Sequence, residues 1–257
     1  MSWSGEDLMI VAGSRLLQDN KVVFAGVGTP LLASVVAQHT HAPHLAIVLE
    51  GGYVDPRMIP GRLPISTNEM RGAHGSVMLT GINDVFLLSQ RGAFDYGFVG
   101  AAQIDRYGNV NTSFIGPVEN PKVRLPGSGG ANDIVSSCRE VLIITRHERR
   151  RFVEKVDFVT SPGYLGGDDA REKAGLVKGR PVAVITDLAV LGFDPESKRM
   201  RLERLQPGIS VEQVIDSTGF ELIVSEAVER EDPPTDEELE ALERVRGEGD
   251  EHATVPR

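Results

Sequence analysis

Short apolar runs without regular alternation constrain the fold of this 257-residue chain more than any other feature. Such runs are typical of strands in a parallel sheet, because both faces of those strands are buried and neither needs polar residues. Segments with helical spacing, or loops, separate the runs along the chain. The sequence therefore predicts an α/β domain with a mostly parallel, open sheet. The expected strands are Val22–Ala25, Leu45–Leu49, Asp95–Val99, Glu140–Ile144, Lys155–Val159 and Pro181–Asp187.

Helical periodicity and capping residues mark the first two expected helices. Glu6–Leu17 carries apolar residues at helical spacing and follows Ser4, which can cap it. The second helix begins after a glycine turn, where Thr29 can cap it. Pro30 suits the first helical position, since no backbone donor is lost there.

Further elements follow in the second half of the chain. A helix is expected after the glycine-rich segment 127–131, and another is expected to start near Ser210. The segment 189–205 is expected to form a β-hairpin at a sheet edge. Its turn is placed at Asp194 and Pro195, because these residue types favour turns.

The chain becomes strongly charged from Glu226 onward. We assign residues 1–228 to one domain and residues 229–257 to an acidic C-terminal tail. Within the tail, Asp236–Val245 is expected to form a short helix that Thr235 caps. Two interpretations stay open: a solvated, frayed tail, or a helix that docks on a partner subunit.

Composition excludes several classes of function. A net charge of −10 argues against a nucleic-acid partner. Cys138 is the one cysteine, so neither a disulfide framework nor a thiolate zinc site is expected, and it is predicted to be buried and inert. The six histidines show no metal-ligand spacing. The N-terminus does not resemble a signal peptide, and no apolar run approaches the roughly 20 residues that span a bilayer. We therefore expect a cytoplasmic protein without a metal or membrane partner.

Glu50 is unusual because it ends an apolar strand and precedes two glycines, Gly51 and Gly52. Burial of an unpaired carboxylate costs several kcal/mol or more, so this group needs hydrogen-bond donors or an opening to solvent. Ligands collect at the carboxyl ends of the strands in open parallel sheets. The sequence therefore predicts a functional carboxylate at a ligand-binding edge.

Glycine-rich turns supply candidate partners for this carboxylate. The segment "AGVGTPLL" resembles half of a dinucleotide fingerprint, but Leu31 stands where the third glycine belongs. Two interpretations compete for this segment. One is a Rossmann oxidoreductase in which Glu50 is the acidic residue of the dinucleotide site, and the other is a turn without a ligand. The segment "GSGGAND" forms a loop whose N–H groups can face one point. It lacks the features of a Walker loop, and no Gly-x-Ser-x-Gly elbow is present, which disfavours a serine hydrolase.

Two other polar segments are weaker candidates. "GAAQIDRYGNVN" follows a predicted strand and brings Gln103 and Asp105 to its end, although part of it also matches a hairpin turn. The basic cluster Arg146–Phe152 is expected to be a solvated surface with Glu148 as internal partner. A phosphate site or a subunit contact is the alternative for Arg149–Arg151.

These segments together give one central carboxylate, many backbone donors and no catalytic Ser, Cys or His. Such a set suits covalent catalysis by a carboxylate on an activated acyl group, with amides that stabilise the oxyanion. A glycosidase could also use Glu50, but aromatic residues make up only 5% of the chain, which argues against a sugar cleft.

Four segments resemble signature segments of family I CoA-transferases, in the same order. "LEGG" places Glu50 where those enzymes carry the glutamate of a Glu-Asn-Gly or Glu-Ser-Gly motif. "GAAQIDRYGNVN", "RLPGSGGAND" and "HERRRFVEKVDFVTSPGYLGG" resemble three further segments, the last in the glutaconate CoA-transferase branch. The resemblance is to the B (β) subunit and extends over roughly residues 5–228. It implies a three-layer α/β fold of the CoA-transferase superfamily and a complex with an A (α) subunit, a heterotetramer or larger.

The resemblance also implies a ping-pong transfer of CoA between an acyl-CoA and a free carboxylic acid. An acyl-glutamyl anhydride and then a glutamyl-CoA thioester form on the enzyme, with coenzyme A as a substrate and no tightly bound cofactor. Gly51 departs from the family, which often carries Asn or Ser there. By position, the nucleophile is Glu50, the oxyanion hole is Val27, Gly129 and Gly130, and the substrate-binding residues are Gly51, Gly52, Gln103 and Asp105.

Two other functions remain open on the same fold. Related enzymes resemble hydrolases or decarboxylases of acyl-CoA substrates, in which a glutamate can serve as a base. The fold also resembles sugar-phosphate sensors, which are binding modules without catalysis. The glutamate at position 50 favours transfer over both.

Overall fold

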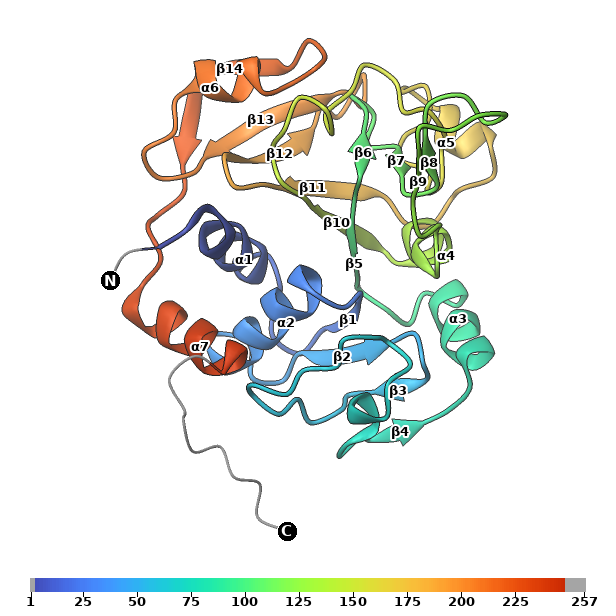
Figure 1. Cartoon of the computed structure of the whole chain (residues 1–257), viewed down its shortest axis with the longest axis vertical. Helices are drawn as coiled ribbons and strands as arrows, with labels where there is room; N and C mark the ends of the chain where they lie inside the picture. The colour runs from blue at the N-terminus through green and yellow to red at the C-terminus, as the bar shows by residue number, and fades with distance from the viewer. Residues whose placement is uncertain (1–2, 248–257) are drawn as a thin grey trace.

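A ten-stranded sheet forms the centre of the protein in the computed structural model, which describes residues 3–247 (Figure 1). Its order is β14-β13-β12-β11-β10-β5-β1-β2-β3-β4, and the five strands from β11 to β2 are mutually parallel. The parallel α/β sheet predicted from the sequence is therefore confirmed. The strands are β1 (Val22–Ala25), β2 (Ala46–Leu49), β3 (Tyr53–Val54), β4 (Met78–Leu79), β5 (Tyr96–Gly100), β10 (Glu140–Ile144), β11 (Pro181–Ile185), β12 (Ala189–Phe193), β13 (Met200–Leu205) and β14 (Ile223–Arg230).

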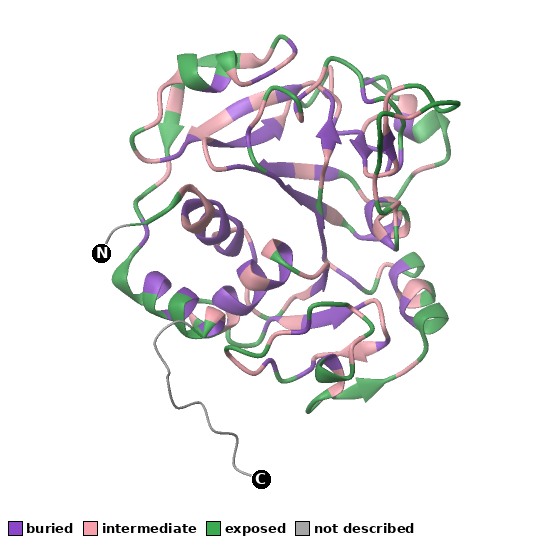
Figure 2. Ribbon diagram, viewed as in Figure 1, coloured by how far each residue is buried: buried purple, intermediate pink, exposed green. Residues whose placement is uncertain are grey.

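Helices cover both faces of the sheet, which gives three layers. Along β1, Val23 and Ala25 pack on the side of α1, α2 and α7, whereas Phe24 packs on the side of α3 and α4. The central strands are therefore buried on both faces, and Figure 2 shows most of their length in the colour of buried residues. No helix within residues 3–247 is long and apolar enough to cross a membrane. The helices are α1 (Gly5–Arg15), α2 (Thr29–His39), the 3₁₀ helix η1 (Met70–Ala73), α3 (Ile82–Gln90), α4 (Ala131–Ser137), α5 (Ala170–Lys173), α6 (Val211–Asp216) and α7 (Asp236–Arg246).

The predicted strand Lys155–Val159 is wrong. The structure assigns no strand to these residues, and Lys155 and Asp157 are exposed. The surrounding segment instead covers a two-stranded hairpin, β6 (Gln103–Ile104) and β7 (Val110–Asn111), to which it connects by single bridges. A second small hairpin, β8 (Phe114–Ile115) and β9 (Val123–Arg124), follows in the chain.

The predicted hairpin over residues 189–205 is confirmed as β12 and β13, which pair antiparallel. Asp194 closes its turn, since Oδ1 accepts hydrogen bonds from the N–H and the Oγ of Ser197, each at 2.7 Å. The prediction that this hairpin lies at the sheet edge is wrong, because β14 pairs with β13 and forms the edge.

The helix caps follow the sequence at Ser4 but not at Thr29. Ser4 accepts a hydrogen bond from the N–H of Asp7, whose carboxylate accepts one from the N–H of Ser4 in return. At the second helix the cap is Gly28, at a φ of 79°, and Thr29 is already helical without a capping hydrogen bond. Gly28 takes this place because the turn needs a left-handed φ, which glycine adopts without strain.

The helix expected in the acidic tail is confirmed as α7, which Thr235 caps together with Glu238. It is not solvated over its described length, because its apolar side packs against α2 and α1 and places Leu242 in the core. Arg15 of α1 donates to Glu238 at 2.7 Å. The boundary assigned at residue 228 falls inside β14, so the strand and α7 continue the same fold. Residues 248–257 of the predicted tail lie outside the described residues.

Replacement of Leu242 with alanine tests this packing. We expect the free energy of unfolding to fall by about 2–4 kcal/mol, because a buried leucine leaves a cavity on α2. Urea denaturation measures this change, and Glu240→Ala on the exposed side of the same helix is the matched control. Equal stability of the two variants would mean that α7 is not part of the cooperative core.

Candidate functional site

Glu50 follows β2 at the carboxyl edge of the parallel strands and is half-buried. Its Oε2 accepts a hydrogen bond from the N–H of Gly130 at 3.1 Å. Gly130 is the N-cap of α4, so the glycine-rich loop and the carboxylate meet as the sequence predicts. The hydrogen bond and the partial exposure explain how a polar side chain is accommodated at the end of a core strand.

The approach of Gly130 to Glu50 leaves no room for a side chain. A Cβ atom on Gly130 would lie 2.8 Å from Glu50 Oε2 and 2.6 Å from Cζ of Phe86. The neighbouring Gly129 has a φ of 49°, and a Cβ there would lie 3.8 Å from the same oxygen. Glycine at position 130 is therefore a steric requirement of this contact.

Gly51 and Gly52 let two loops pack against the carboxylate's own turn. The N–H of Gly51 donates to the carbonyl of Thr67 at 3.2 Å, and a Cβ at position 51 would lie 2.4 Å from that oxygen. It would also meet Oδ1 of Asn68 at 2.9 Å. Gly52 has a φ of 96°, and a Cβ there would lie 1.9 Å from the carbonyl oxygen of Thr80. Gly51 stands where the resembled family often carries Asn or Ser, and its surroundings give a steric reason for glycine. The loop through Asn68 occupies the space that a longer side chain would need.

Val27 follows β1 at the same edge of the sheet as Glu50. Strands β1 and β2 pair in register with Phe24 opposite Val48, and continuation of this register sets Gly26 alongside Glu50. Val27 follows in the turn and is half-buried. Among the described residues, no backbone carbonyl or side chain accepts a hydrogen bond from the N–H of Val27 or of Gly129. Both donors are therefore available to an oxyanion.

Gln103 and Asp105 serve the hairpin instead of facing Glu50. Asp105 accepts hydrogen bonds from the N–H groups of Tyr107 and Asn109, and its burial raises the pKa of its carboxyl. Gln103 donates to Asp157 at 3.0 Å and accepts from Asn111 at 2.7 Å. Each residue is only 5% exposed, and no described contact joins either of them to Glu50.

Other titratable groups have structural surroundings. Burial lowers the pKa of His147 to about 3, and its ring stacks on Phe152 with 4.1 Å between centroids. Burial raises the pKa of Cys138 to about 12, in line with the inert thiol predicted from the sequence. Arg150 and Arg151 pair with Glu148, as expected for a solvated surface. Within residues 3–247, no three His, Cys, Asp or Glu residues are grouped as metal ligands.

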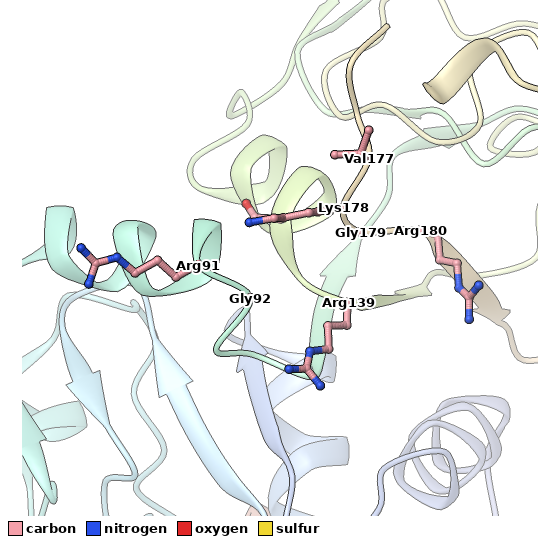
Figure 3. Close-up of a pocket in the computed structure, with 8 residues that line it drawn as sticks. Arg91, Gly92, Arg139, Val177, Lys178, Gly179 and Arg180 are labelled. Carbon is pink, nitrogen blue, oxygen red and sulfur yellow. The ribbon is translucent and has the colours of Figure 1, made fainter. Parts of the chain in front are cut away.

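A basic cavity of about 440 Å³ lies at the opposite ends of the strands, where the sequence predicts no site (Figure 3). Lys178 donates to the backbone of Gln90 at the end of α3. Arg139 and Arg180 pair at 3.6 Å with carboxylates, Asp95 and Glu140 respectively. The basic side chains point away from one another in Figure 3. Their positive charges face the carboxyl end of α3 and the nearby carboxylates instead of one common point. The cavity does not extend the site at Glu50.

Residues 7–217 match the model of the coenzyme A transferase family. The B subunit of 3-oxoadipate CoA-transferase from Pseudomonas knackmussii is 41% identical over 94% of this chain and 92% of that protein. The B subunit of glutaconate CoA-transferase from Acidaminococcus fermentans is 39% identical over 90% of this chain and 88% of its own length.

Solved structures show the same fold. Glutaconate coenzyme A-transferase from Acidaminococcus fermentans superposes with a TM-score of 0.89 and 33% identity, over 99% of each chain. The decarboxylase AibA/AibB superposes with a TM-score of 0.81 and 27% identity, over 96% of this chain and 97% of that chain.

Proposed function

This chain belongs to the coenzyme A transferase family as a B subunit, and from this premise we propose that Glu50 carries coenzyme A between an acyl-CoA and a free carboxylic acid. The observation that carries the proposal is the 3.1 Å hydrogen bond from the N–H of Gly130 to the Glu50 carboxylate at the open edge of the sheet. The relatives named above act on 3-oxoadipate and glutaconate, which are dicarboxylic acids. We propose the same class of acid for this chain.

The reaction proceeds in two half-reactions at one carboxylate. A Glu50 oxygen attacks the thioester carbonyl, the C–S bond breaks, and the CoA thiolate departs. An acyl-glutamyl anhydride remains on the enzyme. The thiolate then attacks the glutamyl carbonyl, and the acyl group departs as its free carboxylate. Glu50 now holds CoA as a thioester. A second carboxylic acid attacks this thioester, and the same steps in reverse release the new acyl-CoA.

Backbone donors surround both carbonyls that react. Attack of the thiolate on the glutamyl group places negative charge on an oxygen of Glu50 itself, and the N–H of Gly130 already donates to that group. The N–H groups of Val27 and Gly129 are without described acceptors and are the donors for the oxyanion of the substrate thioester. A separate oxyanion contact for each carbonyl is the role that we propose for these three residues.

An A subunit completes the enzyme in this proposal. The relatives are named as B subunits, and the AibA/AibB structure has two kinds of chain. We propose an assembly of both kinds of subunit as a heterotetramer or larger, with coenzyme A as a substrate and without a tightly bound cofactor.

The decarboxylase AibA/AibB, which shares the fold, supports a second candidate function. In that case Glu50 acts as a base on an acyl-CoA and never bonds to it. The presence of a carboxylate with a donor on one oxygen is compatible with both roles. Formation of a covalent intermediate separates them.

A trapping experiment tests the proposal. Incubation of the A–B complex with an acyl-CoA is expected to leave coenzyme A on the peptide that contains Glu50, in a linkage that hydroxylamine cleaves. Mass spectrometry of the digested complex detects the adduct, and free coenzyme A in place of the acyl-CoA is the control. Turnover of the acyl-CoA without any adduct would contradict transfer and favour the base mechanism.

A further inference from the structure

A cavity of about 490 Å³ opens beside the turn that leads into α2. Three segments that are distant in the sequence form its walls: residues 27–32, residues 61–65 and the end of α7. Gly28 is exposed at this turn, and a Cβ there would meet no atom within 4 Å. The cavity is therefore open where it reaches the turn.

Two walls of the cavity lead along the chain towards the site at Glu50. Val27 belongs to its wall and follows β1, which pairs in register with β2, the strand that Glu50 follows. The second wall, residues 61–65, leads directly into the loop whose Thr67 accepts the hydrogen bond from Gly51. A thioester carbonyl that contacts the N–H of Val27 would thus have its acyl chain at the mouth of this cavity.

The chemistry of the cavity is apolar with one charged end. Leu32 and Leu63 are half-buried and Ile65 is exposed, so the walls offer hydrocarbon contact. Arg246 is the one charged residue among the described residues that line it. Its Nη1 donates to Asp7, its single acceptor within residues 3–247, and a guanidinium has five N–H donors. Arg246 can therefore keep its contact to Asp7 and still bind a second carboxylate in bidentate fashion.

We infer that this cavity binds the acyl group of the substrate and that Arg246 pairs with the distal carboxylate of a dicarboxylic acyl-CoA. The inference rests on the function proposed above and names the residue that selects its substrate class. The volume lies within the usual range for small-ligand sites, roughly 300–1,000 Å³. Arg246 and Val245 lie at the end of α7, beyond residue 217, where the family match ends.

Matched pairs of substrates test the inference on the A–B complex. Glutaryl-CoA and valeryl-CoA have the same number of acyl carbons and differ in the distal carboxylate. We expect Arg246→Met to lower kcat/KM for glutaryl-CoA on the order of 100-fold and to leave the value for valeryl-CoA within about threefold. Arg246→Lys is expected to keep an intermediate preference, since the charge stays but the bidentate geometry is lost.

Asp7→Asn is the control for a merely structural effect. It removes the ion pair between Asp7 and Arg246 but keeps the guanidinium. The ratio of kcat/KM for glutaryl-CoA to kcat/KM for valeryl-CoA should therefore stay at the wild-type value or rise. Leu63→Trp fills the cavity from the loop and should lower kcat/KM for both substrates relative to acetyl-CoA.

Two results would overturn the inference. One is an unchanged substrate ratio in Arg246→Met, and the other is the same loss of ratio in Asp7→Asn. Wild-type adduct formation on Glu50 with both thioesters is measured first. If the adduct forms and the ratio does not change, only the binding site for the acyl group is wrong; if no adduct forms, the proposed function itself fails.

Discussion

Glutamine in place of Glu50 is expected to reduce CoA transfer by a factor on the order of 10⁴ or more. The amide has nearly the same shape as the carboxylate, and its oxygen can still accept the hydrogen bond from Gly130. It is, however, a poor nucleophile and cannot form a thioester with the CoA thiolate. The loss should therefore appear in kcat, with the fold and substrate affinity preserved.

Initial rates of acyl exchange between two carboxylic acids measure this loss in the assembled A–B complex. Glu119→Gln is the matched control, because Glu119 is exposed and lies in a loop outside the site. Thermal melting of both variants shows whether the fold is intact. Transfer by Glu50→Gln within about tenfold of wild type would exclude Glu50 as the nucleophile.

The site at Glu50 could be predicted because local patterns determine it. An apolar run of five residues defines a strand, and the carboxyl ends of parallel strands share one edge. These two rules place Glu50, but not Gly130, which is 80 residues away and reaches the same edge as the N-cap of α4. The steric need for glycine at position 51 could not be predicted, since it depends on where the loop through Thr67 packs.

Gln103 and Asp105 show why polar residues at the end of a strand can mislead. Asp105 is followed by Tyr107 and Asn109 at the spacing of an Asx-type turn, so local hydrogen bonds occupy its carboxylate. The pairing of Gln103 with Asp157 joins segments 54 residues apart and leaves no local signal. Their substrate-binding role stays a prediction, and their hydrogen bonds favour a structural one.

The C-terminal region is hard to predict because its partners are remote in sequence. The apolar stripe Leu239, Leu242 and Val245 is visible in the sequence, but its binding surface on α2 lies about two hundred residues earlier. Charged residues on the other sides of this helix lower its mean hydropathy, and composition alone therefore indicates a tail. Strand β14 is not predicted for the same reason. The chain is strongly charged from Glu226 onward, and pairing with the remote strand β13 stabilises β14.

Alanine in place of Gly130 is expected to lower kcat for transfer by about 10²–10³-fold, the usual effect of losing an oxyanion donor. The added Cβ would lie 2.8 Å from Glu50 Oε2, closer than nonbonded carbon and oxygen allow. Either the start of α4 moves away or the carboxylate turns aside, and both changes break the 3.1 Å hydrogen bond. Gly166→Ala is the matched control, because a Cβ there meets only Ala170, at 4.0 Å.

A double variant identifies which contact causes the loss. The Cβ at position 130 would also lie 2.6 Å from the ring of Phe86, so Phe86→Ala removes one of the two conflicts and leaves the other. If the carboxylate contact is decisive, Gly130→Ala with Phe86→Ala transfers CoA no faster than Gly130→Ala alone. Recovery to the rate of Phe86→Ala would instead assign the loss to packing of α3 against α4. The N–H of Gly130 would then hold the loop in place without stabilising charge on Glu50.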